Sequence, residues 1–454
     1  MIRGEEGIGC GPFAACATVH RIGELFSLSR HTRFLEPCET GRRAYNTRRA
    51  ERNPPRPKTG AARVPERLYL DNAATSFPKP SEVLEAMRRY AETLGASAGR
   101  GAYREAVETG EILTDCRRRL ARLIGCRKPE QVIFTFNCTG ALNQAIKGLL
   151  KEGDHVVATR MEHNSVLRPL HAMAAGGRVE VTLVAADRES GFVRPEDIFA
   201  AFRANTRLVA LVHASNVTGT LQAVESVGEV TRQRGIRFLV DAAQTAGHMP
   251  IHVDSMNVDL LAMPGHKGLM GPLGTGALYI REGVECELTP LVEGGTGSVS
   301  ELPTQPDFMP DRFESGSHNA IGLAGLGAAL RWIEEETIAS LSAHDRLMSE
   351  RFIAQTSGIE GLTVYGPRDP RRRVAVFSVR MDGLEPQELS ALLDAEFGIQ
   401  TRSGIHCAPF AHETIGTHGR GGTTRISFGA FNTLADVDRA AESLAKLATI
   451  DAHG

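Results

Sequence analysis

Short apolar runs alternate with segments of helical spacing along residues 131–280. A short apolar run that stops at a polar or glycine-containing turn is typical of a buried strand, and apolar positions three or four residues apart predict a helix. The predicted strands are Gln131–Phe136, His155–Ala158, Glu180–Val184, Leu208–Ala214, Ile236–Val240, Leu260–Met263 and Ala277–Ile280. Helical spacing separates several of them, as in Ala141–Leu150 and Glu225–Arg234. Repeated strand–helix units predict an α/β fold whose mostly parallel sheet is covered by helices and binds its ligand at the carboxyl ends of the strands.

The pattern differs on both sides of this region. Before it, apolar positions predict one helix over Val83–Leu94 and a second over Ile112–Leu123. After about residue 316, longer helices alternate with single strands, which predicts a smaller α+β domain. Its predicted helices are Ala320–Glu336, Ser340–Gln355, Glu388–Phe397 and Leu434–Ile450, and its predicted strands are Arg373–Val379 and Thr424–Phe428. We therefore expect a large domain over residues 82–315, a small domain over 316–454, and a segment over 67–81 that packs with the small domain.

Residues 1–66 differ in composition from the rest of the chain. Paired arginines and the segment NPPRPKTGAARVP at Asn53–Pro65 make this part basic and rich in proline, without sustained apolar spacing. Such a composition favours a disordered extension. A targeting peptide is one alternative, although Gly7–Thr18 lacks the unbroken apolar stretch of a signal peptide. A start codon placed too far upstream is another, and we assign the segment no catalytic role.

Composition narrows the classes of function. A chain of 454 residues that is 42% hydrophobic and 23% charged is typical of a soluble protein large enough for two domains. The formal net charge of −2 gives no reason to expect nucleic acid or an acidic membrane surface as a partner. No apolar run approaches the roughly 18 residues of a transmembrane helix. The eight cysteines form no CxxC pair and no zinc-ligand spacing, so free thiols in a reducing cytoplasm are expected.

Two predicted strands that follow each other in the chain end in complementary chemistry. Lys267 lies in a glycine-rich turn, where backbone can approach a ligand closely, although such a lysine alone is usually a solvated surface group. Asp241 ends the preceding strand, and its alternative role is a helix N-cap. A lysine that forms a Schiff base and an acid that keeps a pyridinium nitrogen protonated are what a pyridoxal 5′-phosphate site needs. Gln244 could then donate to the phenolic oxygen of the ring, and His266 could face the phosphate.

Other predicted strands also end in polar side chains. Thr139, with the N–H groups of a helix start, could hold a phosphate, or it could be a plain N-cap. His163 could stack on the cofactor ring and move protons, whereas Asn164 beside it could simply cap the next helix. The amide of Asn216 could reach an oxygen of the cofactor or the substrate. These interpretations depend on the Lys267 and Asp241 pair.

The segment RSGIHCAP at Arg402–Pro409 carries Cys407 in a glycine-containing loop that we expect to be accessible. Positive charge on Arg402, and on His406 when protonated, would lower the pKa of the thiol and favour the thiolate. Most other cysteines after residue 66 lie in apolar patterns and are expected to pack. Arg425 suits a substrate carboxylate, or it is a structural arginine.

The motifs of this sequence, and the order in which they follow one another, resemble those of the cysteine desulfurase/selenocysteine lyase family of the class-V aminotransferases. The resemblance runs from about Tyr69 to the C-terminus and is carried by YLDNAATSFPKP, NCTGALN, MEHNSV, HASNVTGT, DAAQTAG, GHKGLMGPLGTGALYI, GGTGS, FESGSHNA, RSGIHCAP and TTRISFGAFNT. It implies a fold type I enzyme that depends on pyridoxal phosphate, with a seven-stranded sheet in the large domain. It also implies a homodimer with its active site at the subunit interface.

The resemblance further implies roles for individual residues. Lys267 looks like the Schiff-base lysine, Asp241 the pyridinium partner and His163 the ring-stacking acid/base. Cys407 looks like the nucleophile that takes sulfur from L-cysteine as a persulfide and passes it to a sulfur-acceptor protein. The remaining cofactor contacts would be Thr139, Cys138, Gln244, His266 and, from the other subunit, Ser317, and the substrate contacts would be Asn216, Arg425, Asn72 and Arg402. Pro264 stands where many relatives carry a phosphate-binding Ser or Thr, whereas Ser317 replaces a more usual Thr and keeps the hydroxyl.

Two other functions stay open. A selenocysteine lyase acting on L-selenocysteine, or another class-V lyase or transaminase, would use the same cofactor. Cys407 would then be incidental, because selenide leaves without nucleophilic help. A cofactor-binding sulfur-transfer scaffold with little turnover is a third function, against which the set of Lys267, Asp241 and His163 argues.

Overall fold

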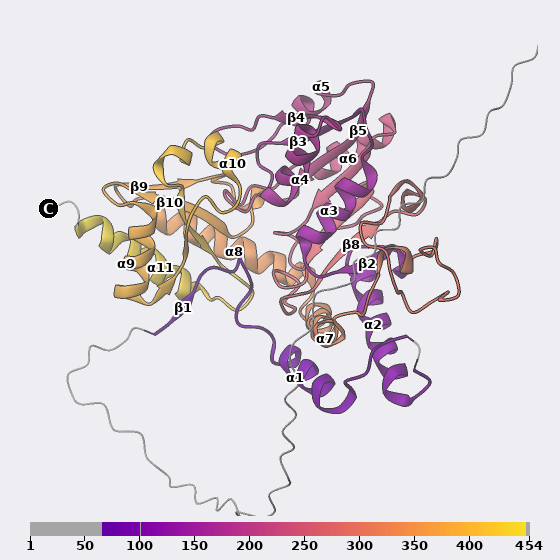
Figure 1. The fold of residues 1–454 in the computed structure, drawn as a ribbon. Coiled ribbons are helices and arrows are strands. Elements are labelled where there is room, and N and C mark those ends of the chain that lie inside the picture. The colour runs from indigo at the N-terminus through magenta and orange to yellow at the C-terminus, as the bar shows by residue number, and fades with distance from the viewer. Residues whose placement is uncertain (1–65, 100, 451–454) are drawn as a thin grey trace, which may run out of the picture. The chain divides into compact units, whose positions relative to one another are not determined.

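The computed structural model describes residues 66–99 and 101–450, so residues 1–65 of the expected extension lie outside the described residues. A seven-stranded sheet forms the centre of the larger part (Figure 1). Its spatial order is β2 (Val132–Thr135), β8 (Gly276–Ile280), β7 (Leu260–Pro264), β6 (Arg237–Asp241), β5 (Thr206–Val212), β3 (Asp154–Thr159) and β4 (Val179–Val184). Strand β8 runs antiparallel to both neighbours, and the pairs from β7 to β4 are parallel. The predicted mostly parallel sheet is confirmed, with each predicted strand within two residues of its observed bounds.

Alternate residues of each strand build two cores, one on each face of this sheet. In β5, Val209 and Leu211 belong to one buried cluster and Leu208 and Ala210 to the other, because successive side chains of a strand point to opposite faces. Helices α2 (Arg104–Leu123), α5 (Pro195–Ala200), α6 (Val224–Arg234) and α7 (Ala320–Glu336) contribute to the first cluster, and α3 (Cys138–Leu149) and α4 (Asn164–Ala175) to the second. Both faces are therefore covered, as a parallel sheet requires.

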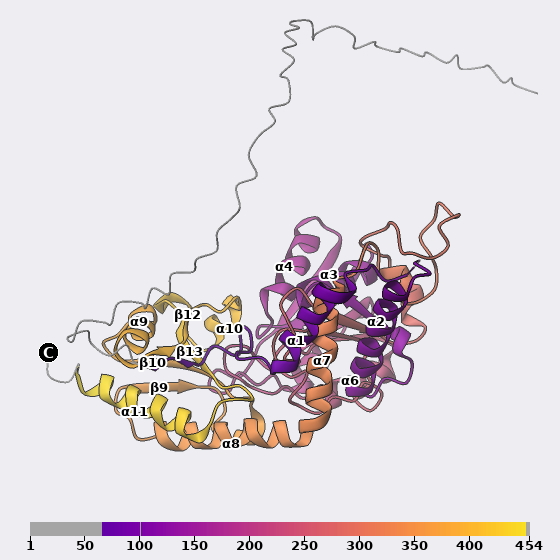
Figure 2. The same ribbon diagram turned by 90° about the horizontal axis from the view of Figure 1, so that it is seen from below.

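A four-stranded antiparallel sheet forms the smaller, C-terminal part. Its order is β12 (Arg402–Gly404), β13 (Thr423–Ser427), β10 (Val376–Met381) and β9 (Leu362–Tyr365). The helices of this part are α8 (Ile338–Thr356), α9 (Pro386–Phe397), α10 (Pro409–Thr414) and α11 (Leu434–Ile450), and α11 lies alongside α8 (Figure 2). The sequence pattern missed β9 and β12, which are short and lack a clear alternation. It also placed the start of β10 three residues early, at Arg373. Arg373 lies before the strand, and its buried side chain donates to the carbonyls of Pro367 and Thr218.

The N-terminal segment joins the two parts. Strand β1 (Leu68–Tyr69) pairs in parallel with β11 (Ile399–Gln400), and Leu70 lies in the core of the small sheet. Helix α1 (Ser81–Arg89) continues as a π-helix, η1 (Tyr90–Leu94), and packs against α7. Helix α7 also packs against α2, which belongs to the large part. We therefore propose that the division between the domains lies at the turn between α7 and α8 rather than at residue 316.

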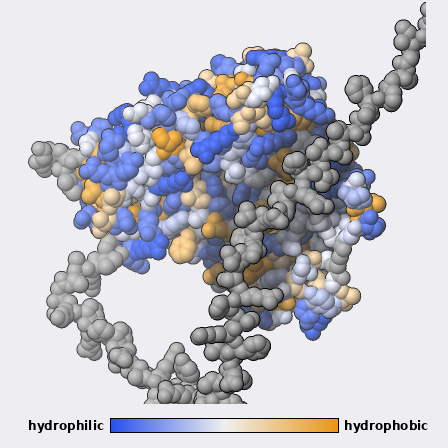
Figure 3. All heavy atoms as spheres, in the orientation of Figure 1, coloured by the Kyte–Doolittle hydropathy of each residue, from blue (hydrophilic) through white to orange (hydrophobic). Residues whose placement is uncertain are grey.

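Short 3₁₀ turns complete the described chain at η2 (Pro129–Gln131), η3 (Val284–Glu287), η4 (Asp311–Phe313), η5 (Pro370–Arg372) and η6 (His418–Arg420). On the face drawn in Figure 3, hydrophilic residues dominate the visible described surface, and hydrophobic residues form small groups between them. Among the described residues, no helix combines the length and apolar character needed to cross a membrane.

Candidate active site

A cavity of about 230 Å³ lies where the carboxyl ends of the parallel strands meet β12 and β13 of the small sheet. Ten of the residues with an expected role in catalysis, cofactor binding or substrate binding line it, although they come from distant parts of the chain: Cys138, Thr139, His163, Asn216, Asp241, Gln244, His266, Lys267, Arg402 and Arg425. Three others, Asn72, Ser317 and Cys407, do not line it. The topology therefore assembles most of the expected set in one place.

Lys267 and Asp241 follow adjacent parallel strands. Asp241 ends β6 opposite Ala262 of β7, and the turn after β7 carries Lys267. Burial, together with the charge of Arg425, lowers the pKa of Lys267, which makes its neutral amine more accessible. Burial raises the pKa of Asp241, opposed by the backbone N–H of Ala243, which donates to its Oδ1 at 2.9 Å, and by Lys267. An amine and an acid thus face one cavity with each pKa shifted toward the neutral form.

The N-terminus of α3 forms another wall. Its N-cap is Asn137, whose side chain accepts from the N–H of Gly140, so the alternative of Thr139 as a plain N-cap is wrong. The Thr139 hydroxyl instead lies 2.8 Å from that of Ser165. Cys138 donates its thiol to Asp241 Oδ1 at 3.6 Å. A helix N-terminus with an exposed hydroxyl suits an anionic group such as phosphate.

His163 caps α4, so the alternative of Asn164 as the cap is wrong. The backbone N–H of Ser165 donates to Nδ1 of His163 at 3.1 Å, which leaves the proton of the neutral ring on Nε2. Burial, aided by the charge of Lys267, lowers the pKa of His163 to about 4. The imidazole is therefore neutral at neutral pH and offers an N–H to the cavity.

His266 precedes Lys267 and is held through its backbone. Its carbonyl accepts from the N–H of Ser76 at 3.1 Å, from Thr75 Oγ1 at 3.1 Å and from Lys79 Nζ at 2.9 Å. Its ring Nδ1 is buried without a partner in the described chain, and burial with the Lys267 charge lowers its pKa to about 4. Pro264, at the end of β7, lines the same cavity and has no N–H to offer.

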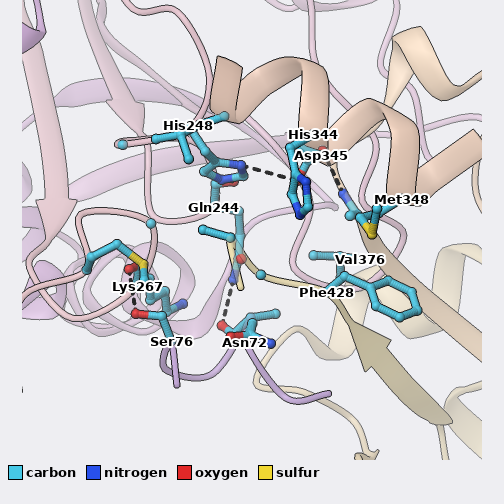
Figure 4. A pocket seen from close by; sticks show the side chains of 18 of the residues that line it. Asn72, Ser76, Gln244, His248, Lys267, His344, Asp345, Met348, Val376 and Phe428 are labelled. Atoms are coloured by element: carbon cyan, nitrogen blue, oxygen red, sulfur yellow. Dashed lines mark hydrogen bonds and ion pairs between the residues drawn. The ribbon is translucent and has the colours of Figure 1, made fainter. Parts of the chain in front are cut away.

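A second, smaller cavity of about 60 Å³ lies beside Lys267 (Figure 4). Asp345 of α8 lies 3.2 Å from Nδ1 of His248, and His248 Nε2 lies 2.8 Å from the carbonyl of Gln244. Gln244 in turn donates its Nε2 to the carbonyl of Ala73 at 3.0 Å. This chain of contacts fixes the loop after β6 between α8 and the N-terminal segment.

Arg425 lies at the junction of the two domains. Its side chain is buried, its Nη2 donates to Asp71 Oδ1 at 2.7 Å, and its Nη1 donates to the carbonyl of Asn216 at 3.2 Å. Asn216 donates its Nδ2 to the carbonyl of His406 at 2.7 Å, while its Oδ1 is buried without a partner in the described chain. Sequence reasoning missed Asp71, although its place directly before Asn72 in the YLDNAAT motif was a usable signal.

Cys407 lies on a sharp turn between β12 and α10. His406 and Cys407 have φ values of 50° and 58°, a left-handed conformation that non-glycine residues rarely adopt. The thiol is exposed as expected, and Arg402 Nη2 lies 3.8 Å from its Sγ. The contribution expected from His406 depended on its protonation, and burial holds the pKa of His406 well below its ordinary value, so the ring is neutral. Cys286 is exposed as well, so the contact with Arg402, and not exposure, distinguishes Cys407.

Asn72 and Ser317 lie elsewhere. The amide of Asn72 donates to the carbonyl of Ser427 at 3.1 Å and accepts from the N–H of Phe77, so it holds a turn and lines the smaller cavity instead of the main one. Ser317 lines a separate cavity of about 390 Å³ beside Asn137. Within one chain, neither residue contacts the main cavity.

Comparison with known proteins assigns the fold to a family. The family model described as Aminotransferase class-V matches residues 68–440. Over 386 residues the chain is 37% identical to a probable cysteine desulfurase of Methanothermobacter thermautotrophicus, covering 84% of this chain and 95% of that protein. It is 30% identical to a cysteine desulfurase of Escherichia coli over 387 residues, which cover 84% and 93% of the two chains.

Solved structures agree with this assignment. The apo structure of a cysteine desulfurase from Thermococcus onnurineus NA1 superposes with a TM-score of 0.78 at 34% identity, covering 84% of this chain and 94% of that chain. A cysteine desulfurase from Escherichia coli superposes with a TM-score of 0.75 at 26% identity, with the same coverage. The similarity thus extends over both parts of the described fold.

Proposed function

This chain belongs to the class-V aminotransferase family, and within it we propose that the protein is a cysteine desulfurase that converts L-cysteine to L-alanine with pyridoxal 5′-phosphate as cofactor. The observation that supports this most directly is the meeting of Lys267, Asp241 and His163 in one cavity beside the Cys407 loop.

The residues of the cavity fit the cofactor. Lys267 would bind its aldehyde group, Asp241 would hold the pyridine N–H, and the neutral His163 would lie against the ring. Thr139, at the N-terminus of α3, and His266, beside Lys267, would hold the phosphate. Nδ1 of His266 is buried without a partner among the described residues, which supports a polar ligand group at this wall of the cavity. When bound, pyridoxal phosphate supplies the electron sink for charge released at the substrate Cα.

The chain's own groups then handle protons and charge. Arg425 would bind the substrate carboxylate, and Asn216 lies beside it with an amide oxygen that is buried without a partner in the described part of the chain. Lys267, whose pKa is lowered by burial and by Arg425, would take the Cα proton as a neutral amine. His163 would carry a proton at Nε2, because its Nδ1 accepts from the backbone of Ser165.

Cys407 would remove the sulfur. Its thiolate attacks the sulfur of the substrate, a new S–S bond forms, and the Cβ–S bond breaks with its electron pair remaining on carbon. A proton then adds to Cβ, and L-alanine leaves while the sulfur remains as a persulfide on Cys407. Arg402, 3.8 Å from the Sγ, would stabilise the thiolate.

A single-turnover assay tests this function. We would mix the purified holoprotein with L-cysteine in the absence of reductant, follow alanine, and map the persulfide by peptide mass. We expect one alanine per site and a persulfide on Cys407. Cys407→Ala should abolish alanine release and keep the cofactor absorbance, whereas Cys286→Ala, which removes the other exposed thiol of the described cysteines, should behave as wild type. Undiminished alanine from Cys407→Ala would refute the assigned role.

One observation favours a second candidate, a lyase for L-selenocysteine. Cys407 does not line the main cavity, and selenide needs no nucleophile to leave. Selenide release by Cys407→Ala without sulfide release would support this candidate.

We further propose that the enzyme is a cytoplasmic homodimer that passes its sulfur to an acceptor protein. The cavity beside Ser317 is flanked by exposed apolar side chains, among them Phe136 and Val292, which a second copy of the chain would cover. Ser317 would then reach the cofactor phosphate of the other subunit. Sedimentation velocity of wild type and of Val292→Glu tests this, because a monomeric wild type would exclude it.

A further inference from the structure

Arg425 is a buried cation that already has a counter-ion. Its side chain is 2% exposed and pairs with Asp71, whose side chain is 20% exposed. A buried guanidinium without an anion is costly, so Asp71 stabilises Arg425 in the ligand-free protein. A substrate carboxylate bound to Arg425 would stabilise the buried guanidinium in the same way.

The remaining N–H groups of Arg425 restrict where such a carboxylate can bind. Nη1 donates to the carbonyl of Asn216, and Nε is buried without a hydrogen-bond partner among the described residues. Asp71 accepts from Nη2 at 2.7 Å, so a ligand carboxylate that binds through Nη2 would lie beside the carboxylate of Asp71. Two carboxylates on this one cation would repel each other.

The other charges near Arg425 favour exchange of one carboxylate for another. Arg402 is its neighbour across the strand pair β12–β13, and Lys267 lies in the same cavity. With Asp71 turned away, the two arginines would face an incoming anion. The partial exposure of Asp71 lets its released carboxylate reach water.

Building on the proposed function, we propose that Asp71 is a specificity-determining residue that holds the carboxylate position on Arg425 in the ligand-free protein and is displaced there by the carboxylate of the amino-acid substrate. Asp71 thereby weakens the binding of every ligand that carries a carboxylate. Ligands without one leave the Asp71–Arg425 pair intact.

Binding titrations on the holoprotein test this inference without turnover. The absorbance of the bound cofactor reports the Kd of L-alanine and of ethylamine, which lacks the carboxylate. Asp71→Asn keeps the shape and one acceptor oxygen but removes the charge, and Asp71→Glu keeps the charge. Asp438→Asn is the matched control, because Asp438 pairs with Arg351 on the surface of the small domain at 2.7 Å. Should Asp71→Asn be poorly soluble, Asp71→Ser takes its place.

We expect Asp71→Asn to lower the Kd of L-alanine at least 5-fold and to leave that of ethylamine unchanged, while Asp71→Glu and Asp438→Asn resemble wild type. A higher Kd for L-alanine in Asp71→Asn would overturn the inference and make Asp71 an orienting partner of Arg425. An unchanged Kd, or a wild type that binds no L-alanine, would overturn it too. Failure of the proposed function would show separately, as the absence of alanine from L-cysteine in the single-turnover assay.

Discussion

Glu314 anchors the loop that carries Ser317, and its removal should be among the most destabilising single changes in the large domain. Its carboxylate is buried and accepts from the backbone N–H of Phe134 at 2.5 Å and from both Nη atoms of Arg117 at 2.6 and 2.8 Å. His318 Nε2 lies 2.7 Å from it as well. The Arg117 guanidinium also lies 4.3 Å from the centre of the Phe134 ring. One carboxylate therefore ties the loop to α2 and to the edge strand β2.

The magnitude follows from what Glu314→Ala leaves behind. Arg117 would keep its charge at only 12% exposure, and the N–H of Phe134 would lose its acceptor. Removing one partner of a buried pair costs about 3–5 kcal/mol. At about 2–4 °C per kcal/mol for a domain of this size, Tm should fall by about 6 °C or more.

Thermal unfolding followed by circular dichroism measures this effect, with Glu334→Ala as control. Glu334 also pairs with two arginines, Arg119 and Arg122, but its side chain is 31% exposed, so its removal should cost less than about 1 kcal/mol. Equal Tm shifts for the two variants would refute the reasoning, because burial is the difference between the pairs.

The pH dependence provides a further check on Glu314. Burial tends to raise its pKa, but Arg117 and His318 outweigh this and hold the pKa below the ordinary value. A carboxyl with a depressed folded-state pKa stabilises the fold above its unfolded pKa of roughly 4.3, and this contribution is lost as the pH falls through the lower folded value. The Tm difference between wild type and Glu314→Gln should be full at pH 6 and shrink below about pH 4. A constant difference would exclude the charge as its source.

Three further predictions concern other parts of the molecule. Burial lowers the pKa of His163 to about 4, so the ring should not titrate between pH 5.5 and 7. The kcat/KM profile of wild type should therefore show no inflection from His163 in this range. An inflection that is present in wild type and absent from His163→Gln would contradict this. Burial lowers the pKa of Lys79 to about 8, so the folded state disfavours its charged form. The Tm of wild type minus the Tm of Lys79→Met should therefore increase as the pH rises from 7.5 to 10. A decrease of this Tm difference over the same range would contradict the prediction. Phe377 is fully buried with its ring centre 4.4 Å from that of Phe352, so Phe377→Ala should cost about 3–5 kcal/mol, which urea unfolding of the variant and of the exposed-site control Phe431→Ala can measure.

The sequence by itself determined the class of fold and most of the candidate site. Apolar runs such as Leu260–Met263 are buried on both faces of a parallel sheet, so their hydrophobicity, their shortness and the turns that end them mark them as strands. Because polar loops at the carboxyl ends of such strands meet at one edge, the sequence alone predicts that Asp241 and Lys267 lie in one site. Local signals failed for β9 and β12, which are short and are stabilised mainly by pairing with neighbouring strands.

Only the tertiary structure decided which charges the site holds. The sequence places beside Cys407 a histidine, His406, that would be a cation if protonated. Burial lowers its pKa and keeps it neutral, so Arg402 supplies the charge near the thiol. Likewise, Asp71 and Arg425 lie at opposite ends of the described chain and meet only because the N-terminal segment joins β13 through the Asp71–Ser427 bridge. Burial and contact between distant segments depend on how elements pack, whereas the functional groups that a loop carries depend only on its own residues. Sequence therefore predicts the reacting groups, and packing sets their protonation and their partners.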